Sequence, residues 1–209
     1  MFNPLKNIKK SKGIDIPLMY IYLAGYMSGE KLAQCTEWRK RIREHYGNYE
    51  ETDTSYPFSF LDPFNGAELE TIDKKGLTSS VSGTAIINGD RMSVNKSDVI
   101  IANMDDFFMD DIQLPYNLIE SPKSVLLSFY KELYDKVAEK RDMIGTHHEL
   151  RWGGDQNKPR LLIVPENKKE MFMKHPFTKD CDYFFTSVQE LLDSKVLESF
   201  YKRIAGAIY

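Results

Sequence analysis

The sequence has little of what marks secreted, membrane-spanning or nucleic-acid-binding proteins. It contains two cysteines, Cys35 and Cys181, and neither lies in a CxxC pair, so we expect no disulfide framework and a reduced, cytoplasmic setting. Residues 1–12 are basic but carry no apolar stretch of signal-peptide length, and no run reaches membrane-spanning length. The net charge of −3 removes any global electrostatic argument for a nucleic acid polymer or a membrane as partner.

What is present is the composition of an ordinary globular domain. Hydrophobic residues make up 42% of the 209 positions and charged residues 28%. A chain of this length buries about 70% of the surface of its unfolded form, so its core needs no disulfides or metals for stability. We expect a flexible tail over residues 1–13 and one domain over residues 14–209.

Short apolar runs alternate with helical segments along this domain. Runs that are apolar throughout are typical of strands buried on both faces of a parallel sheet. Five such strands are expected, at 18–25, 58–61, 98–104, 160–164 and 182–185. Helices are expected over 30–46, from about residue 85, and over 188–204. The alternation predicts an α/β fold of the flavodoxin-like or Rossmann type, with a mostly parallel five-stranded sheet and helices on both faces.

The first expected helix has a clear apolar face. Its apolar side chains recur at spacings of three and four, which predicts that they face the core: Cys35, Trp38, Ile42 and Tyr46. The basic side chains are expected on the other faces: Lys31, Arg39, Lys40 and Arg43.

Two segments fit the minimal sheet less well. Residues 67–84 show little periodicity and are expected to form a mobile loop. Residues 106–142 form an insertion whose apolar helical stripe is compatible with core packing, with a lid, or with a subunit interface.

Ligands of such sheets bind beyond the carboxyl ends of the strands. Here these ends carry Gly25, Asp62, Asn103 and Asp105. Asp90, Asp105 and Glu149 are acidic positions near expected strand ends or helix starts. Cleavage of an N-glycosidic bond passes through an oxocarbenium-like sugar, which a nearby carboxylate stabilises or attacks. A second acidic group can hold or protonate the departing base.

Five short motifs follow one another along the chain: Tyr22-Leu-Ala-Gly25, Gly89-Asp-Arg91, Ser97-Asp-Val-Ile-Ile-Ala102, Gly145-Thr-His-His-Glu149 and Lys158-Pro-Arg-Leu-Leu-Ile-Val164. In this order the chain resembles the nucleoside 2-deoxyribosyltransferase family, which includes deoxynucleoside 5′-monophosphate N-glycosidases. The resemblance spans residues 18–105 and 142–166. It implies that Glu149 is the nucleophile, that Asp90 positions the base or sugar, and that Tyr22 contacts the nucleophile.

The resemblance and the strand ends together nominate further substrate contacts: Gly25, Tyr26, Ser28, Asp62, Asn103, Asp105, Asp142, Gly145 and Thr146. The expected partner is a small nucleoside or nucleotide, and no cofactor or metal is needed. The chain ends in Gly206-Ala-Ile-Tyr209, similar to transferases whose C-terminal tyrosine completes a neighbouring subunit's site, so we expect a homo-oligomer.

The chain departs from the family pattern at Met143, where the transferases have aspartate and the nucleotide hydrolases serine, and at Arg151, where glycine is common. Transfer to another base, strict hydrolysis of a 5′-monophosphate, and nucleotide sensing without turnover all stay open.

Local sequence also permits a structural role for Glu149. Thr146-x-x-Glu149 matches a capping box, in which threonine caps a helix and glutamate returns the hydrogen bond. His147 and His148 are adjacent, so they do not form the i, i+4 pair of a zinc-binding helix. The glycine-containing turn at 25–29 suits either a phosphate or a plain tight turn.

Overall fold

The computed structural model describes residues 8–11, 14–25, 32–47, 56–63, 72–73, 76–77, 83–104 and 144–206. At its centre lies a five-stranded sheet in which every neighbouring pair is parallel. Its strands are β3 (Met19–Gly25), β4 (Phe58–Leu61), β7 (Val99–Asn103), β8 (Arg160–Ile163) and β9 (Tyr183–Phe185). The five predicted strands are therefore confirmed.

The spatial order of the strands is β4-β3-β7-β8-β9. Numbered along the chain, this is the order 2-1-3-4-5 of flavodoxin-like folds. The predicted fold class is thus confirmed, with a sheet that is wholly rather than mostly parallel. The chain leaves β3 toward β4 on one side and later reaches β7 on the other, so the carboxyl ends of β3 and β7 flank the topological switch point.

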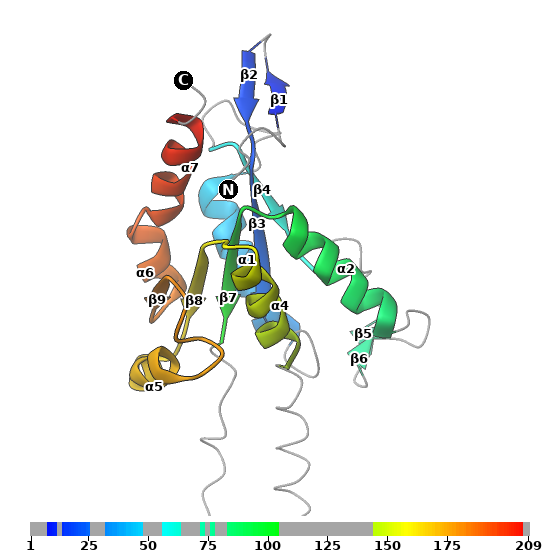
Figure 1. The fold of residues 1–209 in the computed structure, drawn as a ribbon, viewed down its shortest axis with the longest axis vertical. Coiled ribbons are helices and arrows are strands. Elements are labelled where there is room, and N and C mark those ends of the chain that lie inside the picture. Colours follow the sequence, from blue (N-terminus) through cyan, green and yellow to red (C-terminus); the bar gives the residue numbers. More distant parts are fainter. Residues whose placement is uncertain are drawn as a thin grey trace, which may run out of the picture.

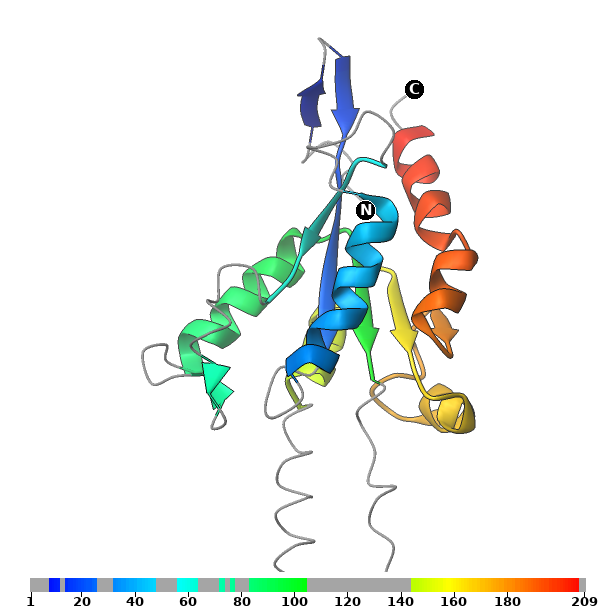
Figure 2. The ribbon, with the colours of Figure 1, turned by 180° about the vertical axis from the view of Figure 1, so that it is seen from behind.

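Helices cover both faces of the sheet. The helices α2 (Gly83–Lys96) and α4 (Ile144–Asp155) lie over the face seen in Figure 1. On the opposite face lie α1 (Leu32–Tyr46), α6 (Val188–Asp193) and α7 (Val196–Gly206), as Figure 2 shows. Side chains of β3 alternate between these layers, because successive residues of a strand point to opposite faces. Ile21 and Leu23 join the core under α1, whereas Tyr22 and Ala24 join the core under α2 and α4.

Helix α1 confirms most of its predicted apolar face, because Trp38, Ile42 and Tyr46 are buried. The expected outward position of Arg39 is wrong, since this side chain is fully buried. Position 39 lies three residues before Ile42 and seven before Tyr46, both of which are buried, so helical geometry places it on the core-facing side. The outward position was predicted because a charged side chain is usually exposed to solvent.

Several smaller elements were not expected. Strand β1 (Ile8–Ser11) lies within the segment predicted as a tail and pairs antiparallel with β2 (Ile14–Pro17). The expected loop over residues 67–84 contains the short antiparallel pair β5 (Ile72–Asp73) and β6 (Gly76–Leu77). A 3-10 turn, η4 (Glu166–Lys168), and helix α5 (Lys169–Lys174) follow β8.

The closing helix is two helices instead of one. Helix α6 ends at Asp193 and α7 begins at Val196. Between them, Lys195 adopts a φ of 53°, a left-handed conformation that ends a right-handed helix. Within the described ranges, no helix is long and apolar enough to cross a membrane.

Candidate active site

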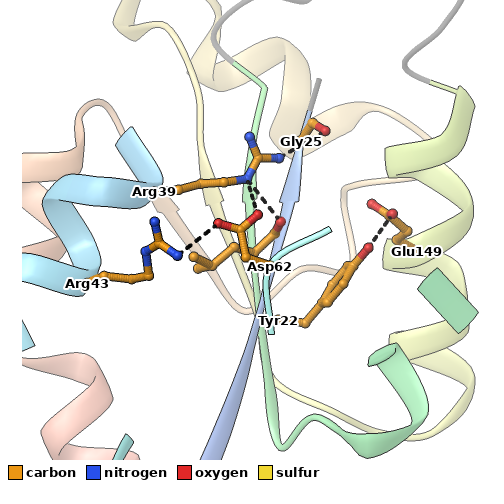
Figure 3. A network of polar contacts seen from close by, with 7 residues as sticks. Tyr22, Gly25, Arg39, Arg43, Asp62 and Glu149 are labelled. Carbon is orange, nitrogen blue, oxygen red and sulfur yellow. Dashed lines mark hydrogen bonds and ion pairs between the residues drawn. The ribbon is translucent and has the colours of Figure 1, made fainter. Parts of the chain in front are cut away.

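A buried hydrogen bond joins the central strand to helix α4. The hydroxyl group of Tyr22 donates to Oε1 of Glu149 over 2.6 Å, between residues 127 positions apart (Figure 3). Tyr22 is fully buried and Glu149 is 6% exposed. A carboxylate this far from solvent needs such a donor, because burial without a partner is costly. Tyr22 and Glu149, both nominated from the sequence, therefore contact each other in the interior of the protein.

Close packing of α4 on the sheet brings Glu149 to this position. A Cβ atom at Gly153 would lie 2.2 Å from Cδ1 of Ile100 on β7, so the helix sits close enough to the sheet that any larger residue there would require the Ile100 side chain to shift. Glu149, Leu150 and Gly153 are spaced so that they share the inner face of the helix, and all three are buried. This packing turns the carboxyl group of Glu149 toward β3.

The capping interpretation of Glu149 does not fit this geometry. Helix α4 begins at Ile144, so Thr146 lies inside its first turn and not at the position before the helix. The carboxyl group of Glu149 bonds to Tyr22 on another element instead of returning to the start of its own helix. Its position is thus set by a tertiary contact.

Asp90 of helix α2 is the third member of the cluster. It is partly buried, and its carboxyl group lies close enough to the hydroxyl group of Tyr22 for each group to change the pKa of the other. Glu149 and Asp90 are also close enough for the charge of one carboxylate to act on the other. The structure thus brings together the three residues to which the sequence assigned catalytic roles, from β3, α2 and α4.

Burial controls the protonation of this cluster. It raises the pKa of Glu149 from 4.5 to about 7; the hydrogen bond from Tyr22 opposes this rise, and the charge of Asp90 adds to it. Burial also raises the pKa of Asp90, while its contact with Tyr22 lowers it. The pKa of Tyr22 is raised far above its ordinary value by burial and by both carboxylates, so the phenol stays protonated. Near neutral pH the site therefore holds a phenol donor between two acidic groups that titrate unusually high.

Comparisons with known proteins establish the fold and not a family. No protein-family model matches the chain, and no curated protein matches it. Among solved structures, it is similar to a conserved protein from Enterococcus faecalis V583, with a TM-score of 0.51 and 13% identity. That match covers 87% of this chain and 99% of the other.

A second solved structure that matches is a CMP N-glycosidase of Clostridium botulinum. Its TM-score is 0.42 and its identity 14%, over 86% of this chain and 98% of the other. Only the first of these two matches has a TM-score above 0.5, and at 13% identity it shows a shared fold alone.

At the switch point, Gly25 ends β3 beside Asn103, the last residue of β7. Gly25 has a φ of 155°, which favours glycine. A Cβ atom there would lie 3.1 Å from Cζ2 of Trp38 and 3.2 Å from the carbonyl oxygen of Asn103. Gly25 therefore lets α1 and β7 close on the end of β3. Gly25 and Asn103, both predicted substrate contacts, thus lie side by side at the carboxyl end of the sheet.

Asp62, another predicted substrate contact, lies in an ion-pair network on the α1 side of β3 (Figure 3). Its Oδ1 is 3.5 Å from Nε of Arg39, and its Oδ2 is 3.5 Å from Nη1 of Arg43. Its side chain is almost fully buried. These contacts bind the carboxylate of Asp62 to arginines of α1. Sequence reasoning missed Arg39 as a member of the site, although its helical spacing could have located it.

The remaining predicted contacts divide into two groups. Gly145 is exposed in the first turn of α4 and Thr146 is buried there. Four predicted contacts lie outside the described residues: Tyr26, Ser28, Asp105 and Asp142. The insertion at 106–142 and Met143 lie outside them as well.

A ring cluster lies at the first turn of α4. The ring of His147 stacks on that of His175 at 5.5 Å between centroids, and Phe177 contacts both rings. Burial, with the two neighbouring imidazoles, lowers the pKa of His147 to about 4, so this ring is neutral near pH 7. In the part of the chain that the structure describes, no group of three or more His, Cys, Asp or Glu side chains could hold a metal ion.

Proposed function

We propose that this protein cleaves the N-glycosidic bond of a ribo- or deoxyribonucleoside or its nucleotide, with Glu149 as the nucleophile. The observation that carries this proposal is the buried carboxyl group of Glu149, held at 2.6 Å by Tyr22 with Asp90 beside it. The cluster extends from β3, whose carboxyl end flanks the switch point where such folds bind ligands. The motif order that resembles nucleoside 2-deoxyribosyltransferases supports the same assignment.

Glu149 supplies the electron pair in the first step. Its carboxylate attacks the anomeric carbon, a carbon–oxygen bond forms, and the carbon–nitrogen bond breaks with its electron pair leaving on the base. The donor Tyr22 binds Oε1, so Oε2 is the oxygen available for attack. The same hydrogen bond opposes the rise that burial causes in the pKa of Glu149 and so favours its reactive, ionised form.

Asp90 is suited to transfer a proton to the departing base. Tyr22 has one phenolic proton and donates it to Glu149. Burial is what favours a proton on the carboxyl group of Asp90, against the opposing effect of its contact with Tyr22. The raised pKa of Asp90 favours this protonated state. Two neighbouring carboxyl groups in opposite protonation states provide an acid and a nucleophile in one site.

The glycosyl-enzyme ester is resolved in a second step. A second base or a water molecule attacks the anomeric carbon, and the bond to Glu149 breaks with its electron pair returning to the carboxylate. Asp90 receives the proton that the incoming nucleophile loses. A second base gives sugar transfer, whereas water gives hydrolysis.

The test is release of free base from a panel of nucleosides and 5′-monophosphates, each with and without an acceptor base. Release without acceptor indicates hydrolysis, and release only with acceptor indicates transfer. Faster turnover of monophosphates would support a phosphate site near the turn at 25–29. Ligand-dependent thermal stabilisation without base release would indicate a nucleotide sensor instead.

Glu149→Gln is the decisive variant. It keeps the shape of the side chain but removes the charge that attacks the anomeric carbon, so the rate of base release should fall by several orders of magnitude. Glu44→Gln serves as the matched control, because Glu44 is exposed and pairs across one turn of α1 with Lys40. A Glu149→Gln variant that keeps more than about a tenth of the wild-type rate, a loss below about 1.4 kcal/mol, would contradict the proposal.

A further inference from the structure

Helix α4 and the central strands contact each other at two adjacent places. Tyr22 on β3 lies directly opposite Ile100 on the neighbouring strand β7, and both side chains belong to the core under α2 and α4. Glu149 and Gly153 lie one turn apart on the inner face of α4. Neighbouring strands are about 4.8 Å apart and four residues of α-helix rise about 6 Å, so two contacts fit side by side. Glu149 bonds to Tyr22, and Gly153 lies against Ile100.

The contact between Gly153 and Ile100 leaves little space for one more carbon atom. A Cβ atom at residue 153 would lie 2.2 Å from Cδ1 of Ile100, about 1.3 Å closer than the roughly 3.5 Å of ordinary carbon–carbon contact. Ile100 is fully buried among side chains packed as densely as an organic crystal, so it has little room to move aside. Glycine inside a helix is less favourable than alanine, and this close approach is the physical reason for glycine here.

The hydrogen bond between Tyr22 and Glu149 depends on the same close approach. The two oxygen atoms are 2.6 Å apart (Figure 3), and O–H···O bonds seldom exceed about 3.0 Å. An α-helix is rigid over a single turn, because each backbone N–H group bonds to the carbonyl group four residues back. A displacement of α4 away from the sheet by about 1 Å at Gly153 would therefore carry Glu149 away from Tyr22 and break this bond.

Arg160 on β8 continues the same row of the sheet. It lies opposite Ile100, and a Cβ atom at Gly154 would lie 2.5 Å from its Nη1. This guanidinium group is the end of a long, partly exposed side chain, so it can move aside more readily than the fully buried Ile100. Ile100 is therefore the more rigid part of the surface on which α4 rests.

We infer that Ile100 is a positioning residue of the candidate active site: its contact with Gly153 sets the height of α4 above the sheet and so holds the carboxyl group of Glu149 within hydrogen-bond reach of Tyr22. The inference rests on the proposed function in that the reaction requires Glu149 at this place. The two can fail separately, because the interaction between Tyr22 and Glu149 can be measured without any turnover.

The measurement is the effect of Tyr22→Phe on the titration of Glu149. The carboxyl carbon of Glu149 is followed by NMR in the full chain with isotope-labelled glutamate, and Glu149→Gln identifies its signal. In the wild type, Tyr22→Phe should raise the pKa of Glu149 by about one to two units, because a hydrogen bond to a charged group is lost. In a variant where that bond is already broken, the same substitution should move the pKa by less than about 0.3 units.

Gly153→Ala should break the bond. Its methyl group forces α4 and Ile100 apart, so the effect of Tyr22→Phe should disappear, and kcat for base release by the folded protein should fall about 10- to 100-fold. Adding Ile100→Val removes Cδ1 and leaves Cγ1 at 3.5 Å from the new methyl group, an ordinary contact. This double variant should regain the effect of Tyr22→Phe and most of the wild-type kcat. It carries the test if Gly153→Ala alone does not fold.

Two comparison variants add the same methyl group elsewhere. Gly154→Ala meets the more movable side chain of Arg160 and should weaken the effect of Tyr22→Phe less than Gly153→Ala does. Gly206→Ala lies at the exposed end of α7, where a Cβ atom meets open space, and should leave both the effect and kcat unchanged.

The outcomes separate the two proposals. A full effect of Tyr22→Phe in Gly153→Ala, or no effect in the double variant, would overturn the inference about Ile100. A larger loss in Gly154→Ala than in Gly153→Ala would overturn it as well. Loss and recovery of the effect in a protein that releases no base from any substrate would instead refute the proposed function and leave the positioning role of Ile100 standing.

Discussion

Replacing Tyr22 by phenylalanine removes the hydroxyl oxygen and keeps the aromatic ring. The variant therefore tests the hydrogen bond to Glu149 separately from the packing of the ring. The ring and its contacts remain, but the donor at 2.6 Å from Oε1 of Glu149 is lost. A hydrogen bond to a charged group contributes about 1.5–3 kcal/mol. Since one pKa unit corresponds to about 1.4 kcal/mol, the pKa of Glu149 should rise by about one to two units.

The consequence is a strong change in the pH dependence of activity. The starting pKa of Glu149 is about 7, so about half of the wild-type carboxyl groups are ionised at pH 7. In Tyr22→Phe this fraction should fall to between about a tenth and a hundredth, and the rate of base release at pH 7 should fall about 5- to 50-fold. Much of the loss should be regained at about pH 9, where the carboxyl group ionises again.

The assay is the pH profile of kcat/KM for base release, which reports the ionisation of the free enzyme. Tyr183→Phe is the control, because Tyr183 is 40% exposed on the edge strand β9. An acidic limb in Tyr22→Phe within about 0.3 pH units of the wild type would refute the reasoning, since that shift corresponds to only about 0.4 kcal/mol. Equal loss of activity at every pH would show that Tyr22 orients Glu149 without affecting its charge.

Three further predictions concern stability. The pKa of Glu149 is higher in the folded state, about 7 against 4.5, so its contribution to the free energy of unfolding is present below about pH 4.5 and is lost as the pH rises through about 7. Urea unfolding of Glu149→Gln should therefore show a gain over wild type at pH 8, up to about 3 kcal/mol, that is absent at pH 4; equal curves would contradict the buried carboxylate. Gly25→Ala should lower the free energy of unfolding by about 1–3 kcal/mol, because of the φ at this position and the close contacts that a Cβ atom would make. Gly89→Ala in α2, where a Cβ atom meets open space, should raise it by about 0.5–1 kcal/mol. Lys158→Met should cost about 1–3 kcal/mol in thermal or urea unfolding, because its ammonium group donates to three carbonyl groups at the end of α2, and the exposed Lys174→Met should change stability by less than about 0.5 kcal/mol.

The sheet could be predicted from the sequence because its signal is local. Runs such as 98–104 are apolar at every position, which only a strand covered on both faces explains at that length. The alternation of such strands with helices then limits the topology to a few forms. The α/β class, with helices on both faces of a parallel sheet, followed from that pattern, whereas the order of the five strands came from the structure.

The predictions from sequence were wrong where contacts between residues distant in the chain determine the structure. The charge of Arg39 predicts a solvent-facing side chain. Its helical spacing instead places it in the interior, where it donates a hydrogen bond to the carbonyl group of Gly25 at the end of β3. The closing segment has an uninterrupted helical pattern, but Lys195 takes a left-handed conformation and divides it. Neither outcome is visible in a window of neighbouring residues.

The site itself shows the same division. The sequence by itself determined which residue types were available, and the order of its motifs nominated Tyr22, Asp90 and Glu149. It also left a helix cap open as an alternative role for Glu149, because Thr146-x-x-Glu149 satisfies that local pattern. Only the tertiary structure decided between these interpretations, because the partner of Glu149 lies 127 positions away and reaches it only once α4 packs on the sheet at Gly153. The raised pKa of that carboxyl group has the same origin, since burial belongs to the folded chain and not to its sequence of residues.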